Sequence, residues 1–109
     1  MKSCGAQDPS VWEDDRGFHM VSHGHFDERG YLAYALKPEG PWHFRHEPTY
    51  TNVLQLTNGS NVTMLQRERP QIFFNETTGE PAILFTGVAP PGAAFYGYTY
   101  THAHRIRQP

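Results

Sequence analysis

The sequence predicts an all-β protein, and three observations support this fold class. Aromatic residues make up 14% of the 109 residues, and aromatic side chains are enriched in strands. The chain also contains 10 glycines and 9 prolines, which supply turns at short intervals. Short segments alternate with period two, whereas no stretch of about ten residues or more shows a helical period.

The first half of the chain predicts a four-stranded antiparallel sheet. Its first hairpin has a turn at residues 14–17 that ends in a glycine, as hairpin loops of this length require. Later turns contain the prolines and glycines that end strands. The four expected strands are residues 10–13, 18–23, 31–36 and 42–45.

The second half predicts further hairpins and then a basic tail. Asn58-Gly59 is a strong hairpin signal between two alternating segments. The expected strands are residues 52–57, 62–65, 71–75, 81–87 and 95–101. The last of them has tyrosines at alternate positions, which we interpret as a cross-strand aromatic cluster. Residues 102–109 are expected to be a solvated basic tail.

One arrangement of acid, proline, strand, turn and glycine occurs twice. Asp8 comes just before the first copy and Glu68, 60 positions later, just before the second. Four-stranded sheets that recur at a period of several tens of residues indicate a β-propeller, in which the first strand of each blade lines the central channel. We therefore expect one partial antiparallel β-propeller domain over residues 1–109, with about two four-stranded blades at about 8–46 and 52–105. Asp8 and Glu68 should then face one cavity.

Charge and composition limit the classes of partner, cofactor and cellular location to be expected. The formal net charge is -2 with a pI near 6.4, so we expect no nucleic-acid partner and no membrane partner. No cofactor is expected. Cys4 is the single cysteine and has no disulfide partner in the chain. The first residues show no signal peptide, which leaves localisation open. Glycosylation sequons at Asn58, Asn61 and Asn75 favour an extracellular protein if an N-terminal segment is missing.

Two carboxylates that face one pocket suit glycoside hydrolysis, in which one of them donates a proton to the leaving oxygen. Glu68 is the candidate acid. On a strand, Arg67 and Arg69 would point away from its face and would not hold it ionised. The competing interpretation of Glu68 is a solvated surface charge between two arginines.

Residues 7–20, together with Arg67-Glu68-Arg69-Pro70 and the strand pair that ends at Gly87, resemble the five-bladed β-propeller glycosidases of glycoside hydrolase family 43 and its relatives, such as arabinanases, xylosidases, invertases and levansucrases. The resemblance implies a glycan substrate, with Glu68 as general acid and Asp8 as transition-state stabiliser. The family's third carboxylate, an aspartate that acts as base or nucleophile, has no counterpart before Asp8. The resemblance therefore implies an incomplete active site. A non-catalytic carbohydrate-binding or structural propeller fragment is the alternative, and uncovered blade edges favour self-association in either case.

Three further residues are candidates for substrate binding. His23 is expected at the channel mouth, where it would hydrogen-bond a sugar hydroxyl, with Arg67 near it. Trp12 would stack on a sugar ring or pack between blades. His19, His23 and His25 alternate and share a face, but no Cys, Asp or Glu lies at ligand spacing, so we expect no metal.

Overall fold

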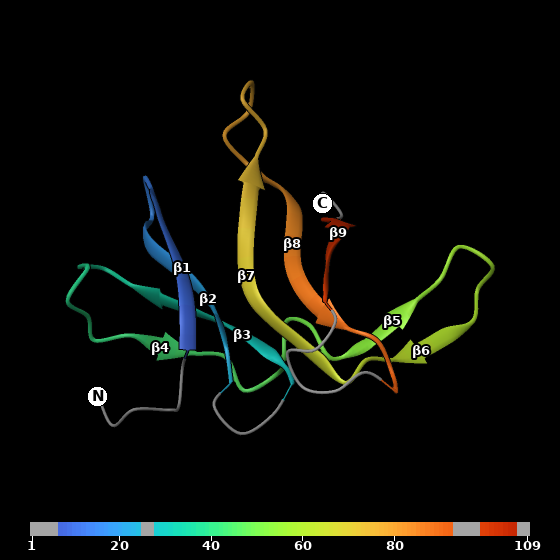
Figure 1. The fold of residues 1–109 in the computed structure, drawn as a ribbon. Helices are drawn as coiled ribbons and strands as arrows, with labels where there is room; N and C mark the ends of the chain where they lie inside the picture. The colour runs from blue at the N-terminus through green and yellow to red at the C-terminus, as the bar shows by residue number, and fades with distance from the viewer. Residues whose placement is uncertain (1–6, 25–27, 93–98, 107–109) are drawn as a thin grey trace.

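The structure is a computed structural model that describes residues 7–24, 28–92 and 99–106. Its elements are strands in three antiparallel sheets, and the all-β prediction is confirmed for these residues (Figure 1). Within the same ranges, no helix has the length and apolarity to cross a membrane.

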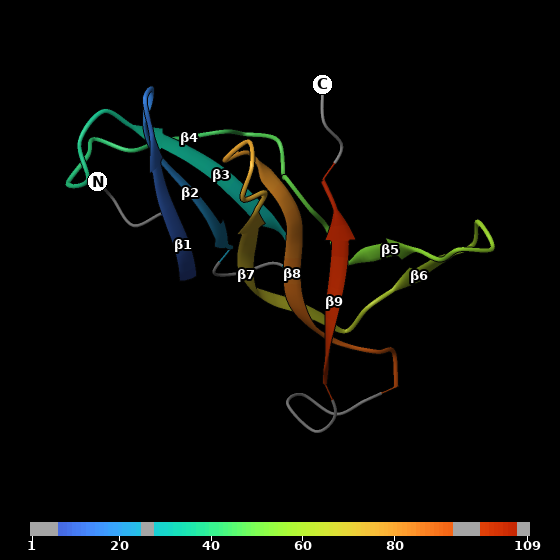
Figure 2. The same ribbon diagram turned by 90° about the horizontal axis from the view of Figure 1, so that it is seen from above.

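The three sheets follow one another along the chain. The first has the order β1 (Gln7–Asp14), β2 (Gly17–His23), β3 (Gly30–Ala35), β4 (His43–Phe44). The second is a hairpin of β5 (Val53–Gln55) and β6 (Asn61–Thr63). The third has the order β7 (Gln66–Phe74), β8 (Pro81–Ala89), β9 (Tyr100–Arg105). Seen from above, the third sheet lies between the first sheet and the β5–β6 hairpin (Figure 2).

The first sheet confirms the four predicted strands. In the second half of the chain, β5 to β8 overlap predicted strands, but their arrangement differs from prediction. The two hairpins of this half do not form one four-stranded blade, because β5–β6 is a separate sheet. Residues 102–105, predicted as a solvated tail, belong to β9 and pair with β8 from Thr86 to Ile83. A strand edge on β8 needs a hydrogen-bonding partner, and this segment supplies it although its side chains are mostly polar. Tyr96 and Tyr98 of the predicted tyrosine row lie outside the described residues.

β1 and β7 share an irregularity at their prolines. In β1, Gln7 and Ser10 are three residues apart, but their partners on β2 are only two residues apart. In β7, Glu68 and Gln71 are likewise three residues apart, and their partners on β8 are two residues apart. Each strand therefore has a β-bulge, and each is at the edge of its sheet, where a proline without an N–H is tolerated.

The bulges show which residues of the two strands are equivalent. The residue before each proline is left-handed, with φ of 49° at Asp8 and 57° at Arg69. Asp8 therefore corresponds in backbone position to Arg69, and Gln7 corresponds to Glu68. The repeat expected from sequence is present in the backbone, but the two acids are offset by one residue. Left-handed non-glycine residues are uncommon and cluster at functional sites.

The core lies between the first and third sheets. Val21 of β2 and Leu84 of β8 are buried with Tyr50, which comes from the segment between the sheets. Partly buried residues from both sheets pack around them, namely Trp12, Leu32, Ile72 and Ile106. β1 and β2 both contact β7. A second cluster of Leu54, Met64 and Val88 attaches the β5–β6 hairpin to β8. The first strands of the two larger sheets are thus held side by side.

Gly30 and Tyr50 make the closest contact between the first sheet and the connecting segment. The Gly30 N–H donates to the Tyr50 carbonyl at 3.0 Å, and the Thr49 N–H donates to the Gly30 carbonyl at 2.6 Å. A Cβ on Gly30 would lie 1.9 Å from Cε2 of the Tyr50 ring. A side chain is therefore sterically excluded at Gly30.

We expect Gly30→Ala to lower the free energy of unfolding by roughly 1–3 kcal/mol, because the added methyl group forces the buried Tyr50 ring to move. Urea denaturation of the purified protein measures this change. Gly87→Ala is the matched control, since its Cβ would meet its nearest atom at 3.8 Å. Equal stabilities of the two variants would contradict the prediction.

Candidate functional site

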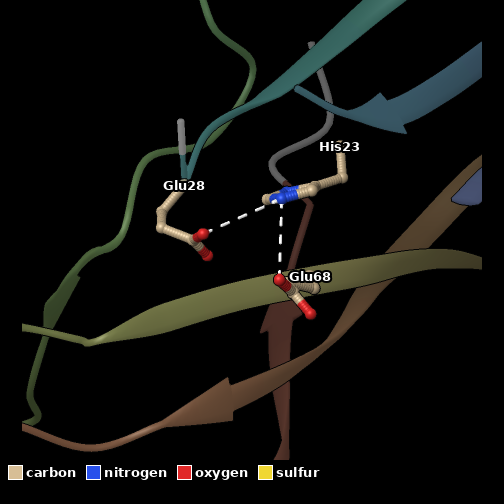
Figure 3. Close-up of side chains that lie close together, drawn as sticks. All are labelled: His23, Glu28 and Glu68. Atoms are coloured by element: carbon tan, nitrogen blue, oxygen red, sulfur yellow. Dashed lines mark ion pairs between the residues drawn. The ribbon is translucent and has the colours of Figure 1, made fainter. Parts of the chain in front are cut away.

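Three side chains with metal- or proton-binding atoms converge where β2 ends and β7 begins (Figure 3). His23 Nε2 lies 3.7 Å from Glu68 Oε2 and 3.9 Å from Glu28 Oε2. One ligand atom from each residue lies within 4.8 Å of the others. The His23 side chain is 3% exposed, whereas those of Glu28 and Glu68 are 23% and 17% exposed. The cluster is therefore recessed, with its carboxylates toward solvent.

Backbone pairing brings these residues together. His23 is the last residue of β2 and pairs with Gly30, so the loop that carries Glu28 starts and ends beside it. Glu28 Oε1 accepts a 2.7 Å hydrogen bond from the Arg67 backbone N–H, which ties this loop to β7. Glu68 Oε2 accepts a 3.2 Å hydrogen bond from Gln66 Nε2 on its own strand. Both carboxylates are thus oriented by bonds to β7.

Arg67 is buried on the core face of β7, opposite Glu68, as strand alternation predicts. Its Nε donates to Thr86 Oγ1 at 3.1 Å, and its Nη1 donates to the Thr51 carbonyl at 2.8 Å. The guanidinium carbon lies 4.6 Å from the centroid of the Tyr50 ring, a cation–π distance. Burial lowers the pKa of Arg67. The guanidinium is therefore engaged in the core and does not point toward the carboxylate pair.

Tyr50 connects this core to the acids. Its hydroxyl is buried and has no hydrogen-bond partner among the described residues. Burial raises the pKa of Tyr50, the Arg67 charge opposes this, and the charges of Glu28, Glu68 and Asp8 raise the pKa further. Three carboxylates from three separate segments thus lie close enough to influence one phenol.

The structure brings some of the sequence-predicted site residues together and leaves one apart. Glu68 and His23 are in contact, and Arg67 is beside them with its side chain in the core. Asp8 is exposed, at the same end of β1 as Gln7, which pairs with His23. Trp12 pairs with His19 and lies toward the opposite end of the β1–β2 hairpin.

Trp12 lines a different hollow, between the tips of the β1–β2 and β7–β8 hairpins. Its ring stacks on His19 with centroids 5.5 Å apart and meets Phe74 edge-on at 5.6 Å. This cleft has a volume of about 660 Å³ and is lined also by Asp14, Arg16 and Glu80. Trp12 therefore packs between the first and third sheets.

Glu28 is the site residue that sequence reasoning missed. It lies in a charged loop bracketed by Gly24 and Gly30, and no motif marks it. The pairing of His23 with Gly30 was the available signal, because it makes the loop a hairpin connection that keeps Glu28 near the end of β2. Its contact with Arg67 spans 39 positions and could not be inferred from local pattern.

Comparisons with family models, curated proteins and solved structures each gave no match.

We expect Thr86→Val to lower the free energy of unfolding by roughly 1–3 kcal/mol, because it removes the oxygen that accepts from the buried guanidinium of Arg67. Thr86→Ser keeps this oxygen and should be the more stable of the two variants. Chemical denaturation followed by tryptophan fluorescence measures both. A valine variant at least as stable as the serine variant would show that this hydrogen bond contributes nothing.

A second prediction concerns acid stability. Arg16 and His19 hold the pKa of Asp14 well below its ordinary value of 3.8, through contacts at 2.7 Å and 2.9 Å. Because the folded pKa is depressed, the stabilisation is present above the unfolded pKa and is lost as pH falls toward the folded one. Asp14→Asn should therefore lower the melting temperature at pH 7, and its difference from the wild type should shrink between about pH 5 and pH 2.

Thermal unfolding at a series of pH values tests this prediction, with Asp15→Asn as a control that removes the same charge from the same turn. A difference between wild type and Asp14→Asn that stays constant below pH 5 would count against it.

Proposed function

We propose that this chain contributes two neighbouring blades of a glycosidase-like β-propeller and that it binds carbohydrate at the end of β1 and β7. The blades are the β1–β4 sheet and the β7–β9 sheet, the latter with three strands in the described residues. The observation that carries the proposal is the pair of equivalent bulged first strands, which lie in contact and bring acids from both to one end.

In this proposal Glu68 is the general acid and Asp8 is the stabilising carboxylate. Glu68 combines partial burial with a neighbouring imidazole, a setting in which a carboxyl group can exchange a proton with a ligand. His23 lies within reach of the same ligand. Arg67 acts as a positioning residue, since its backbone orients Glu28 and its side chain is bonded to Thr86 and Thr51.

Binding is the first activity to test. Isothermal titration calorimetry with a panel of pentofuranose and hexopyranose oligosaccharides, in the presence of EDTA, should show saturable binding to at least one of them. Glu68→Gln should weaken that binding by about tenfold or more, as expected for loss of a hydrogen bond to a charged group. Glu47→Gln, at an exposed position, is the matched control. Unchanged affinity in Glu68→Gln would remove the role proposed for this residue.

Hydrolysis separates the catalytic interpretation from the binding one. The 109 residues offer no aspartate before Asp8 for the base or nucleophile, so we expect negligible turnover of aryl glycosides. Saturable binding without turnover fits a non-catalytic carbohydrate-binding domain. Turnover that disappears in Glu68→Gln would instead establish an enzyme with a base supplied from elsewhere in the chain.

A further inference from the structure

We propose that His23, Glu28 and Glu68 form a binding site for a divalent transition-metal ion, with Zn²⁺ as its representative. No residue of this site was expected to bind a metal from sequence. The ligands would be His23 Nε2 and one oxygen from each carboxylate, which is a common set for zinc and leaves a fourth coordination position open.

The distances between the three ligand atoms are closer to those between ligands of one metal ion than to the length of a hydrogen bond. The 3.7 Å and 3.9 Å distances from His23 Nε2 to the carboxylates exceed a hydrogen bond. Two ligand atoms each about 2.1 Å from zinc lie roughly 3.4 Å apart at the tetrahedral angle and at most about 4.2 Å apart. All three atoms lie within 4.8 Å of one another, so the two carboxylate oxygens would have to approach each other by at most about 1.4 Å to complete a tetrahedral arrangement.

Burial supplies an independent argument. His23 is 3% exposed, and its imidazole faces the gap between the two carboxylates in Figure 3. Its Nδ1 has no hydrogen-bond partner among the described residues, so no contact there fixes the ring in place. An ion on Nε2 would give the imidazole a strong partner on the side that faces the two carboxylates, while Nδ1 would stay unpaired in the described part of the chain.

Charge and orientation agree with a cation. A neutral imidazole and two carboxylates together carry two negative charges, which one divalent ion balances. The Arg67 N–H holds Glu28 through Oε1 while Oε2 faces His23, and Gln66 holds Glu68. Such outer contacts orient metal ligands. His23 Nδ1 makes no such outer contact within the described residues, and loss of one typically lowers metal affinity 10–100-fold. We therefore expect a dissociation constant for zinc in the micromolar range.

The inference does not depend on the proposed function. A metal-bound Glu68 is unavailable as an acid, so the ion and a sugar would compete for it. For this reason the metal titration is done without carbohydrate and the carbohydrate titration with EDTA. Failure of either one leaves the other result intact.

The experiment titrates ZnCl₂ into the tag-free protein after removal of EDTA. Calorimetry should show one site per chain, and Glu28→Gln, which keeps an oxygen for the Arg67 N–H, should weaken it by about tenfold or more. His104→Gln is the control, because His102 and His104, with ring centroids 6.3 Å apart, are the competing imidazole pair. In the wild type, the side-chain ¹⁵N resonance of His23 Nε2 should shift on zinc addition.

Three results would overturn the proposal. One is the absence of saturable binding. Another is binding that His104→Gln abolishes while Glu28→Gln leaves it unchanged. The third is saturation of the wild-type protein with zinc while the ¹⁵N resonance of His23 Nε2 does not shift. This result needs no variant, so it tests the site even if a variant does not fold.

Discussion

A buried guanidinium group, that of Arg67, is the constraint on which the rest of the structure depends. Removing a charge from water costs several kcal/mol, so the fold must surround it with acceptors and a π face. It does so with Thr86 from β8, the Thr51 carbonyl and the Tyr50 ring. The connecting segment between the sheets is therefore fixed by polar contacts to β7 as much as by apolar packing.

The same residue joins the core to the candidate site. The side chain of Arg67 points into the core, while its backbone N–H binds Glu28 on the other side of the junction. Tyr50, which packs on Arg67, also lies against Gly30, the residue that pairs with His23. A disturbance of this core would thus reach the carboxylates through short contacts. The packing of this core and the positions of the two carboxylates are therefore coupled at this point of the molecule.

Local patterns predicted the hairpins, while long-range contacts decided the site. Period-two alternation and turn glycines located β1 to β4 and the β7–β8 pair, because these features report on neighbours in sequence. Glu28 could not be found this way, since its partner Arg67 is 39 positions away. Residues 102–105 of β9 were predicted as a tail because pairing with β8, and not their own apolar content, makes them part of a strand. The acid–proline repeat was visible, but the one-residue offset required the bulge geometry.

The bulge in β7 also separates two features of the strand, which are the pattern of inward-facing side chains and the position of Glu68 near its start. Glu68 and Gln71 pair with Gly87 and Phe85, which share a face, so the additional residue is absorbed without exchanging the two sides of the ribbon. A natural deletion of Arg69 would leave the inward-facing set of side chains intact and remove the local irregularity next to Glu68. A deletion in the regularly paired part of the strand would instead exchange the inward-facing and outward-facing side chains on one side of it. In evolution, the bulge could therefore be lost, with a change at the candidate site, while the architecture survives.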